Sequence, residues 1–222
     1  MANALSHDLR APLRAIDGFS RALAEECQDG ISPRGQEYLK WIAEAVHGMG
    51  RQIEALVSMA RLSVADVRWQ TVDLSNLAQQ IAAVQNAAHP GHNVQVDIAG
   101  GLQVTADARL LGLVMECLMQ NAWVFTGQAG EARVAVGQEL RDGRPVFFVR
   151  DNGLGFGANQ AERLFQPFSR LHTPDQAPVG LGMGLCKARR AIARMGGEIW
   201  AESSPGAGAT FFFTLGAAPD QK

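Results

Sequence analysis

The hydrophobic pattern of this chain changes its period near residue 66, so two different kinds of structure must follow one another along the sequence. Before this point apolar residues recur at alternating spacings of four and three, which is typical of helices packed in a bundle. One stripe consists of Leu5, Leu9, Pro12, Ile16, Phe19 and Leu23, and the other of Tyr38, Ile42, Ala45, Met49, Ile53 and Leu56. We therefore predict two antiparallel helices with a kink at Pro12 and a connecting turn over 28–35.

Beyond residue 66 short β-type segments are interspersed with helical patterns. Strands are predicted at 71–74, 93–98, 102–105, 131–139, 145–150, 198–201 and 210–215, and helices at 74–87, 107–125 and 184–195. Because the order is not a regular alternation, we predict an α+β sandwich with three helices on one face of a mixed sheet. The domains are predicted at 1–66 and 67–222. The helical hairpin needs a second copy to cover its stripes, so a homodimeric four-helix bundle is expected through 1–66.

Composition excludes several classes of protein. The 222 residues are 47% hydrophobic, enough to bury a core, and 20 Lys and Arg against 22 Asp and Glu give no basic excess for nucleic acid. Three separate cysteines, Cys27, Cys117 and Cys186, form no CxxC pair, which favours free thiols and a cytoplasmic location. No apolar run reaches the length of a membrane span. Membrane attachment of a longer parent protein stays open.

His7 is the first candidate for chemistry. It lies opposite the apolar stripe of its helix and should face solvent, and Asp8 follows it directly. An imidazole oriented by a carboxylate can act as a nucleophile toward phosphorus. An ordinary surface histidine would show the same pattern, so position alone does not decide between the two.

Two glycine-rich segments lie farther along the chain, Asp151-Asn-Gly-Leu-Gly155 and Gly180-Leu-Gly-Met-Gly184. A carboxylate followed by glycines suits the amino group of adenine, and glycines that open a helix suit phosphates. Either segment alone could be a simple turn. The order of His7, Asn121 and both segments favours a nucleotide pocket.

The helix at 107–125 carries two polar candidates away from its apolar face. The amide oxygen of Asn121 could bind Mg²⁺ between phosphates, and Glu116 could orient a proton acceptor or a water molecule. Both could equally be solvated surface positions. The polar segment 157–179 is predicted to be a lid from which Arg170 meets a phosphate.

Together these segments resemble the catalytic core of two-component sensor histidine kinases, in which a phosphoacceptor helix pair precedes an Hsp90-like ATP-binding domain. The resemblance covers nearly the whole chain and rests on motifs that follow one another in the family's order. Residues 6–13, SHDLRAPL, resemble the phosphoacceptor box. The resemblance implies that His7 is phosphorylated and that Asp8 is its acid/base partner.

The resemblance also implies which residues hold the nucleotide, and it implies ATP and Mg²⁺ as cofactors. Asn121 matches the Mg²⁺-binding residue. Adenine recognition is implied for Asp151, Gly153 and Gly155, and phosphate binding for Gly180, Gly182 and Gly184. The remaining matches are Phe165, Pro167, Phe168 and the segment 206–211. The last of these places Thr210 among the cofactor-binding residues. The implied partners are a response regulator receiver domain, a second copy of the chain and an upstream sensor domain outside it.

Three positions depart from the family pattern. Cys117 stands where an asparagine is usual and is a poor ligand for Mg²⁺, while Val124 stands where a lysine usually meets a phosphate. Ala11 lacks the hydrogen bond thought to support dephosphorylation of the regulator. A degenerate nucleotide-binding dimer that signals by conformation therefore stays an alternative. An Hsp90-like ATPase that hydrolyses ATP with water is disfavoured, because such enzymes need a glutamate at the place of Cys117.

Overall fold

The computed structural model describes residues 2–26, 30–64, 66–127, 129–169, 171 and 181–217, with the backbone alone described at 2–11, 26, 63 and 64. The chain divides into two compact units, Met1–Ala65 and Asp66–Lys222. We refer to them as the helical unit and the sandwich unit. None of the helices in the described residues combines the length and the apolar character that a membrane crossing demands.

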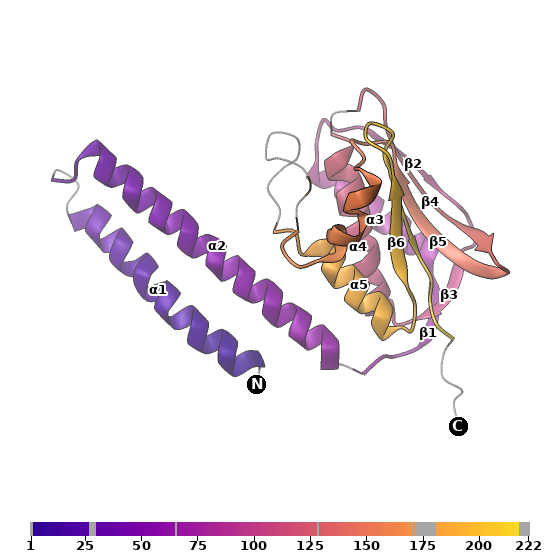
Figure 1. Ribbon diagram of the computed structural model, residues 1–222, viewed down its shortest axis with the longest axis horizontal. Coiled ribbons are helices and arrows are strands. Elements are labelled where there is room, and N and C mark those ends of the chain that lie inside the picture. Colours follow the sequence, from indigo (N-terminus) through magenta and orange to yellow (C-terminus); the bar gives the residue numbers. More distant parts are fainter. Residues whose placement is uncertain are drawn as a thin grey trace. The chain divides into compact units, whose positions relative to one another are not determined.

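The helical unit consists of α1 (Ala2–Glu26) and α2 (Pro33–Val64), which lie side by side in Figure 1. The α1 helix continues through Pro12. Proline is well tolerated in the first turn of a helix, and α2 starts at Pro33 behind Ser32, whose hydroxyl accepts a hydrogen bond from the Gly35 N–H at 3.2 Å. The helix therefore starts within the segment predicted as a turn.

The apolar stripes of this hairpin are largely exposed in the single chain. Buried apolar side chains of α2 include Val46 and Ala55. The stripe residues Ile16, Phe19, Leu23, Tyr38, Ile42, Met49 and Leu56 are exposed, and Phe19 is 78% exposed. Two helices alone cannot enclose side chains of this size, so the predicted core is not closed within one chain.

The sandwich unit contains a five-stranded mixed sheet in the order β2-β4-β5-β7-β6. Its strands are β2 (Val94–Ile98), β4 (Ala132–Arg141), β5 (Arg144–Asp151), β6 (Ile199–Ser203) and β7 (Ala209–Phe213). Only the pairing of β2 with β4 is parallel among these strands. The two further strands, β1 (Gln70–Asp73) and β3 (Gln103–Ala106), pair with each other in a separate small sheet. Seven strands were predicted and are present, but their division into two sheets was not predicted.

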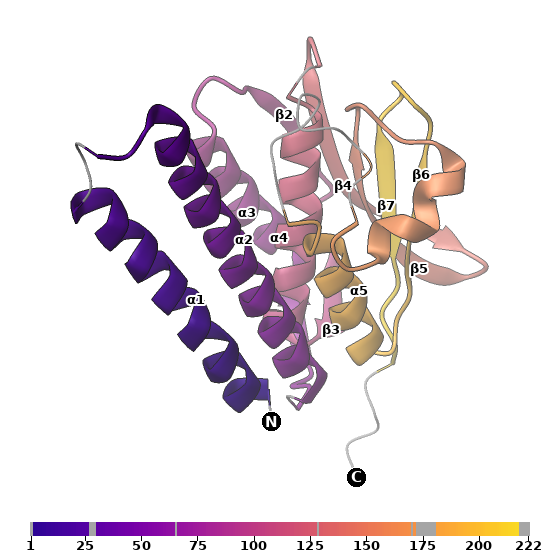
Figure 2. The ribbon, with the colours of Figure 1, turned by 60° about the vertical axis from the view of Figure 1, so that its left-hand side comes forward.

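Three helices cover one face of the five-stranded sheet, as Figure 2 shows. They are α3 (Leu74–Ala88), α4 (Ala108–Phe125) and α5 (Gly184–Arg194), close to their predicted ranges. The side chains of Asp73 and Asp107 accept hydrogen bonds from the first turns of α3 and α4, which fixes where these helices begin. The α4 helix is the centre of the core, with Leu111, Val114 and Leu118 fully buried.

The segment predicted as a lid begins with a regular element. Residues Ala158–Phe165 form the 3₁₀-helix η1, and Phe165 at its end is buried. The first part of the segment is therefore a regular element that packs through Phe165, not an irregular loop. Of the predicted lid, 157–179, residues 170 and 172–179 lie outside the described residues.

No helix formed by the described residues of the sandwich unit covers the second face of the five-stranded sheet. Aromatic side chains stack there, with the rings of Trp200 and Phe212 5.5 Å apart. The guanidinium of Arg141 lies 4.0 Å from the centre of the Phe212 ring and bonds to Glu202 at 2.8 Å. We call this the open face. Its rings are shielded by arginine side chains instead of by a second layer.

Candidate functional site

Asp151 ends β5 with its carboxylate on the helix-covered side of the sheet, where it is buried. Its Oδ1 atom accepts hydrogen bonds from the backbone N–H groups of Gly153 at 2.9 Å and Ala209 at 3.3 Å. Within the described residues no group donates to Oδ2. One oxygen is thus fixed by the fold, and the other can accept a hydrogen bond from a ligand.

The environment of this carboxyl group shifts its titration. Burial raises the pKa of Asp151 to about 6, although the two backbone hydrogen bonds act in the opposite direction. The group is therefore mainly ionised at neutral pH at a cost in desolvation. A ligand that donates a hydrogen bond, such as an amino group, would offset part of this cost.

Glycine is required at two positions of the segment after Asp151. A side chain at Gly153 would meet the carbonyl group of Phe125. Gly155 has a φ of +62°, and a side chain there would meet the carbonyl oxygen of Ser204. Bare backbone therefore lies next to the carboxylate, as a flat ring would need.

Backbone hydrogen bonds hold this segment on both sides. The Leu154 N–H donates to Phe125 O at 3.2 Å, at the end of α4, and the Gly206 N–H donates to Leu154 O at 2.7 Å. After Asp151 the chain continues to η1 and does not return as a paired strand. The segment is therefore not a simple hairpin turn, which was the alternative interpretation of its sequence. It forms a fixed edge of a site.

The α4 helix connects this edge to the second glycine segment. Asn121 is half-buried one turn before Phe125, and Cys117 lies one turn earlier. A Cβ atom on Gly184 would lie 3.8 Å from the Cys117 sulfur, so the start of α5 faces this part of α4. Glu116 is exposed beside Cys117. The structure thus brings Asn121 between the two glycine segments.

The start of α5 is suited to an anion. Gly182 has a φ of +66°, and a Cβ atom there would lie 2.5 Å from the carbonyl oxygen of Ser169. Met183 precedes the helix and provides no side-chain hydrogen bond to it. The first N–H groups of α5 are therefore not capped by this residue, and they carry the positive end of the helix dipole.

Thr210 is placed differently from the other predicted nucleotide-binding residues. It pairs with Arg150 across β5 and β7, and its hydroxyl accepts a hydrogen bond from Arg150 Nε at 3.2 Å. Residues opposite each other in a ladder share a face, and neighbours along a strand point to opposite faces. The side chain of Thr210 therefore lies on the open face, away from the carboxylate of Asp151.

Four predicted site residues belong wholly or in part to segments outside the described residues. His7 and Asp8 belong to the helical backbone of α1, and their side chains lie outside the described residues. Arg170 and Gly180 also lie outside the described residues.

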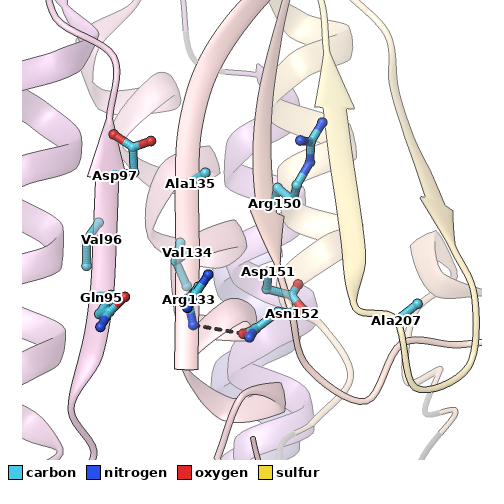
Figure 3. A pocket seen from close by; sticks show the side chains of 10 residues that line it. All are labelled: Gln95, Val96, Asp97, Arg133, Val134, Ala135, Arg150, Asp151, Asn152 and Ala207. Carbon is cyan, nitrogen blue, oxygen red and sulfur yellow. Dashed lines mark hydrogen bonds between the residues drawn. The ribbon is translucent and has the colours of Figure 1, made fainter. Parts of the chain in front are cut away.

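A hollow of about 530 Å³ lies on the open face, at the ends of β2, β4 and β5 (Figure 3). Asn152 lines it and joins two strands: its Oδ1 accepts from the Arg133 N–H at 2.8 Å, and its Nδ2 donates to Glu131 O at 2.7 Å. These bonds fix the end of β5 directly beside Asp151. Asn152 therefore stabilises the site from the open face, opposite the side on which the Asp151 carboxylate lies.

Sequence reasoning missed this role of Asn152 and a similar one of Ser203. The Ser203 hydroxyl accepts from the Phe156 N–H at 2.8 Å and donates to Gly208 O at 2.7 Å, which joins the segment after Asp151 to the β6–β7 turn. Gly208 could have been found from its motif. Nothing in the sequence marks Ser203, because its partners come from distant segments.

Comparison with known proteins agrees with this geometry. Residues 106–219 match the family described as histidine kinase-, DNA gyrase B-, and HSP90-like ATPase, and residues 1–64 match the His kinase A (phospho-acceptor) domain. The chain is 33% identical over 212 residues to cyanobacterial phytochrome B of Nostoc sp., an alignment that covers 95% of this chain and 28% of that protein. It is 32% identical over 216 residues to the histidine protein kinase DivJ of Caulobacter vibrioides, with 93% and 35% covered.

A solved structure shows the same fold. The crystal structure of full-length ShkA in complex with AMPPNP superposes with a TM-score of 0.66 at 25% identity and covers 98% of this chain and 46% of that one. The chain therefore spans only part of the length of these relatives. With both family matches in the expected order, it belongs to the histidine kinases, whose phospho-acceptor domain and ATPase domain it carries one after the other.

Proposed function

We propose that this chain transfers the terminal phosphoryl group of ATP to His7 and then to an aspartate of a response regulator receiver domain. The observation that carries the proposal is the assembly around α4, where a buried carboxylate with one available oxygen and an uncapped helix start flank Asn121. This combination can hold the two ends of a nucleotide, its base and its phosphates.

In this proposal Asp151 accepts a hydrogen bond from the adenine amino group. Gly153 and Gly155 allow the ring to approach the backbone, and Gly182 and Gly184, with Gly180 before them, receive the phosphates. Arg170 and Glu116 keep the roles implied by the resemblance, as a phosphate contact and as an orienting carboxylate. Thr210 is left out because its hydroxyl is bonded to Arg150 on the open face.

The donor set near the phosphates fits Mg²⁺ bound mainly through the nucleotide. Among the described residues no three His, Cys, Asp or Glu side chains form a metal cluster. Mg²⁺ commonly uses one or two protein oxygens together with phosphates and water, so the amide oxygen of Asn121 suffices. Burial raises the pKa of the Cys117 thiol to about 11, and sulfur is a poor ligand for a hard cation such as Mg²⁺, so Cys117 is left out of the ligand set.

The chemical step needs an outward-facing imidazole. One ring nitrogen of His7 forms a bond to the γ-phosphorus while the bond from phosphorus to the bridging oxygen breaks and ADP leaves. The Asp8 carboxylate accepts a hydrogen bond from the N–H of the other ring nitrogen, and it takes that proton as positive charge develops on the ring. The second transfer breaks the new phosphorus–nitrogen bond in favour of a carboxylate oxygen of the receiver domain.

Labelling with γ-³²P-ATP and Mg²⁺ tests the assignment. His47 supplies the control, because it also lies in the phospho-acceptor match but its Nδ1 bonds to the carbonyl oxygen of Ala43 at 2.7 Å. We expect acid-labile label on the wild type and on His47→Gln, and none on His7→Gln. Label that persists in His7→Gln, or that resists acid, would contradict the proposal.

Two observations favour a second candidate, a nucleotide-binding dimer that signals by conformation. Cys117 and Val124 remove an amide and a positive charge from the phosphate side of the site. Calorimetric ATP binding without any phosphohistidine would support this candidate. Hydrolysis by water is disfavoured, since a neutral thiol at Cys117 cannot act as a general base; steady phosphate release without labelled protein would support hydrolysis instead.

A further inference from the structure

Lys187 lies in the first turn of α5, beside the phosphate end of the proposed site. Its backbone N–H donates to Met183 O at 3.0 Å, so it belongs to the regular helix. It follows Gly184 by three residues and therefore shares a helix face with it, and Gly184 faces Cys117 on α4. Ala188 on α5 is fully buried in the adjoining core.

The lysine side chain is directed toward the glycine segment. Side chains on a helix lean toward its N-terminus, which for α5 is the end that begins at Gly184. Lys187 is half-buried. Burial raises the pKa of the Cys117 thiol, and the positive charge of Lys187 opposes that rise, so the ammonium lies near the thiol.

This charge faces a stripe of α4 from which a charge is missing. Cys117, Asn121 and Val124 follow one another at four and three residues, so they lie along one line of the helix, and all three are half-buried. Val124 stands where the family pattern has a lysine. In the described part of the chain Lys187 makes no ion pair with an acidic side chain, so its charge is available to an anion.

We propose that Lys187 binds the β- and γ-phosphates of the nucleotide and replaces the positive charge that Val124 cannot supply. The inference rests on the proposed function, because it concerns the same ATP site. A compact ammonium on a flexible chain suits this task, since it needs no fixed direction of approach. The substitution at Val124 is then compensated from the neighbouring helix, and the site keeps its capacity for a triphosphate.

Calorimetry on the whole chain with Mg²⁺ tests this inference, with ATP and AMP as ligands. In Lys187→Met we expect ATP affinity to fall about tenfold, as for loss of one charge-assisted hydrogen bond, and AMP affinity to change less than about threefold. Arg189→Gln is the matched control, because it removes the same charge from an exposed position two residues along the helix. It should leave both affinities within about twofold of the wild type.

Two further variants distinguish a phosphate contact of Lys187 from a purely structural role. Lys187→Arg should retain ATP affinity, and Val124→Lys added to Lys187→Met should restore it. Equal losses for ATP and AMP, or unchanged ATP affinity in Lys187→Met, would overturn the inference while the proposed function stands. Absence of ATP binding by the wild type would overturn the proposed function and this inference with it.

Discussion

The two units of this chain bury their apolar side chains in different ways. In the sandwich unit Phe213 is fully buried, because a sheet and three helices enclose a core within one chain. In the helical unit Phe19 is 78% exposed, although it belongs to a regular apolar stripe. The same residue type therefore serves two purposes. In the sandwich unit it stabilises a single chain, and in the helical unit it provides a surface that a second copy can cover.

The largest effect is expected from a charge placed in the exposed stripe. If the chain is a homodimer through 1–66, Phe19→Glu removes two buried phenylalanines per dimer at about 1.5–3 kcal/mol each. The dimer should weaken by two to four orders of magnitude, at about 1.4 kcal/mol for each tenfold change. Sedimentation analysis measures the change in mass.

Val84→Glu supplies the control for this experiment. Val84 is 64% exposed, but it lies on α3 of the sandwich unit. This variant should sediment like the wild type. A monomeric wild type, or a dimer that tolerates Phe19→Glu, would show that the exposed stripe of the helical unit is not a dimer interface.

The next effect concerns the stability that the sandwich unit loses by burying the carboxylate of Asp151. Asp151→Asn should stabilise the nucleotide-free protein at neutral pH while it weakens ATP binding. Burial raises the pKa of Asp151 to about 6 from its ordinary 3.8. The stability linked to this carboxyl group is fully present below the lower value and is lost as the pH rises through the upper one. The difference between these values corresponds to about 3 kcal/mol.

Urea denaturation measures this effect as the free energy of unfolding in the transition of the sandwich unit. The gain of Asp151→Asn over the wild type should grow from near zero at about pH 4 to about 3 kcal/mol at about pH 8. Asp97 on β2 is the control, because it is exposed and its carboxyl group stays in water on folding. A gain that is the same at both pH values would show that burial of the charge is not its cause.

The order of helices and strands could be predicted from local patterns. Alternation and helical spacing located seven strands and five helices, because these periods are set by each element's own exposed and buried faces. The division of β1 and β3 into their own sheet could not be predicted. It depends on which strands meet, such as Thr71 with Thr105, and no local pattern carries that information.

The candidate site shows the same limit. Asp151, Gly153 and Gly155 were found from their motif, and the structure agrees that their backbone is crowded. Thr210 belongs to a motif as well, but a motif does not tell which face of the sheet a residue occupies. That depends on its pairing with Arg150. The neighbourhood of Cys117 and Lys187 likewise depends on how α4 and α5 pack, so the charge opposite Val124 could not be predicted.

The smallest effect compares one glycine from each unit. Gly155→Ala should destabilise the sandwich unit by at least about 2 kcal/mol, because alanine is strained at a φ of +62° and its Cβ atom would meet Ser204 O. Gly48→Ala should instead stabilise the helical unit by about 0.5–1 kcal/mol, since Gly48 lies within α2 with no atom within 4 Å of an added Cβ. Thermal unfolding of both variants shows whether each substitution raises or lowers the stability of its unit. Destabilisation by Gly48→Ala would mean that a partner helix packs closely against this position, so the helical unit would depend on close backbone contact as well as on its exposed stripe.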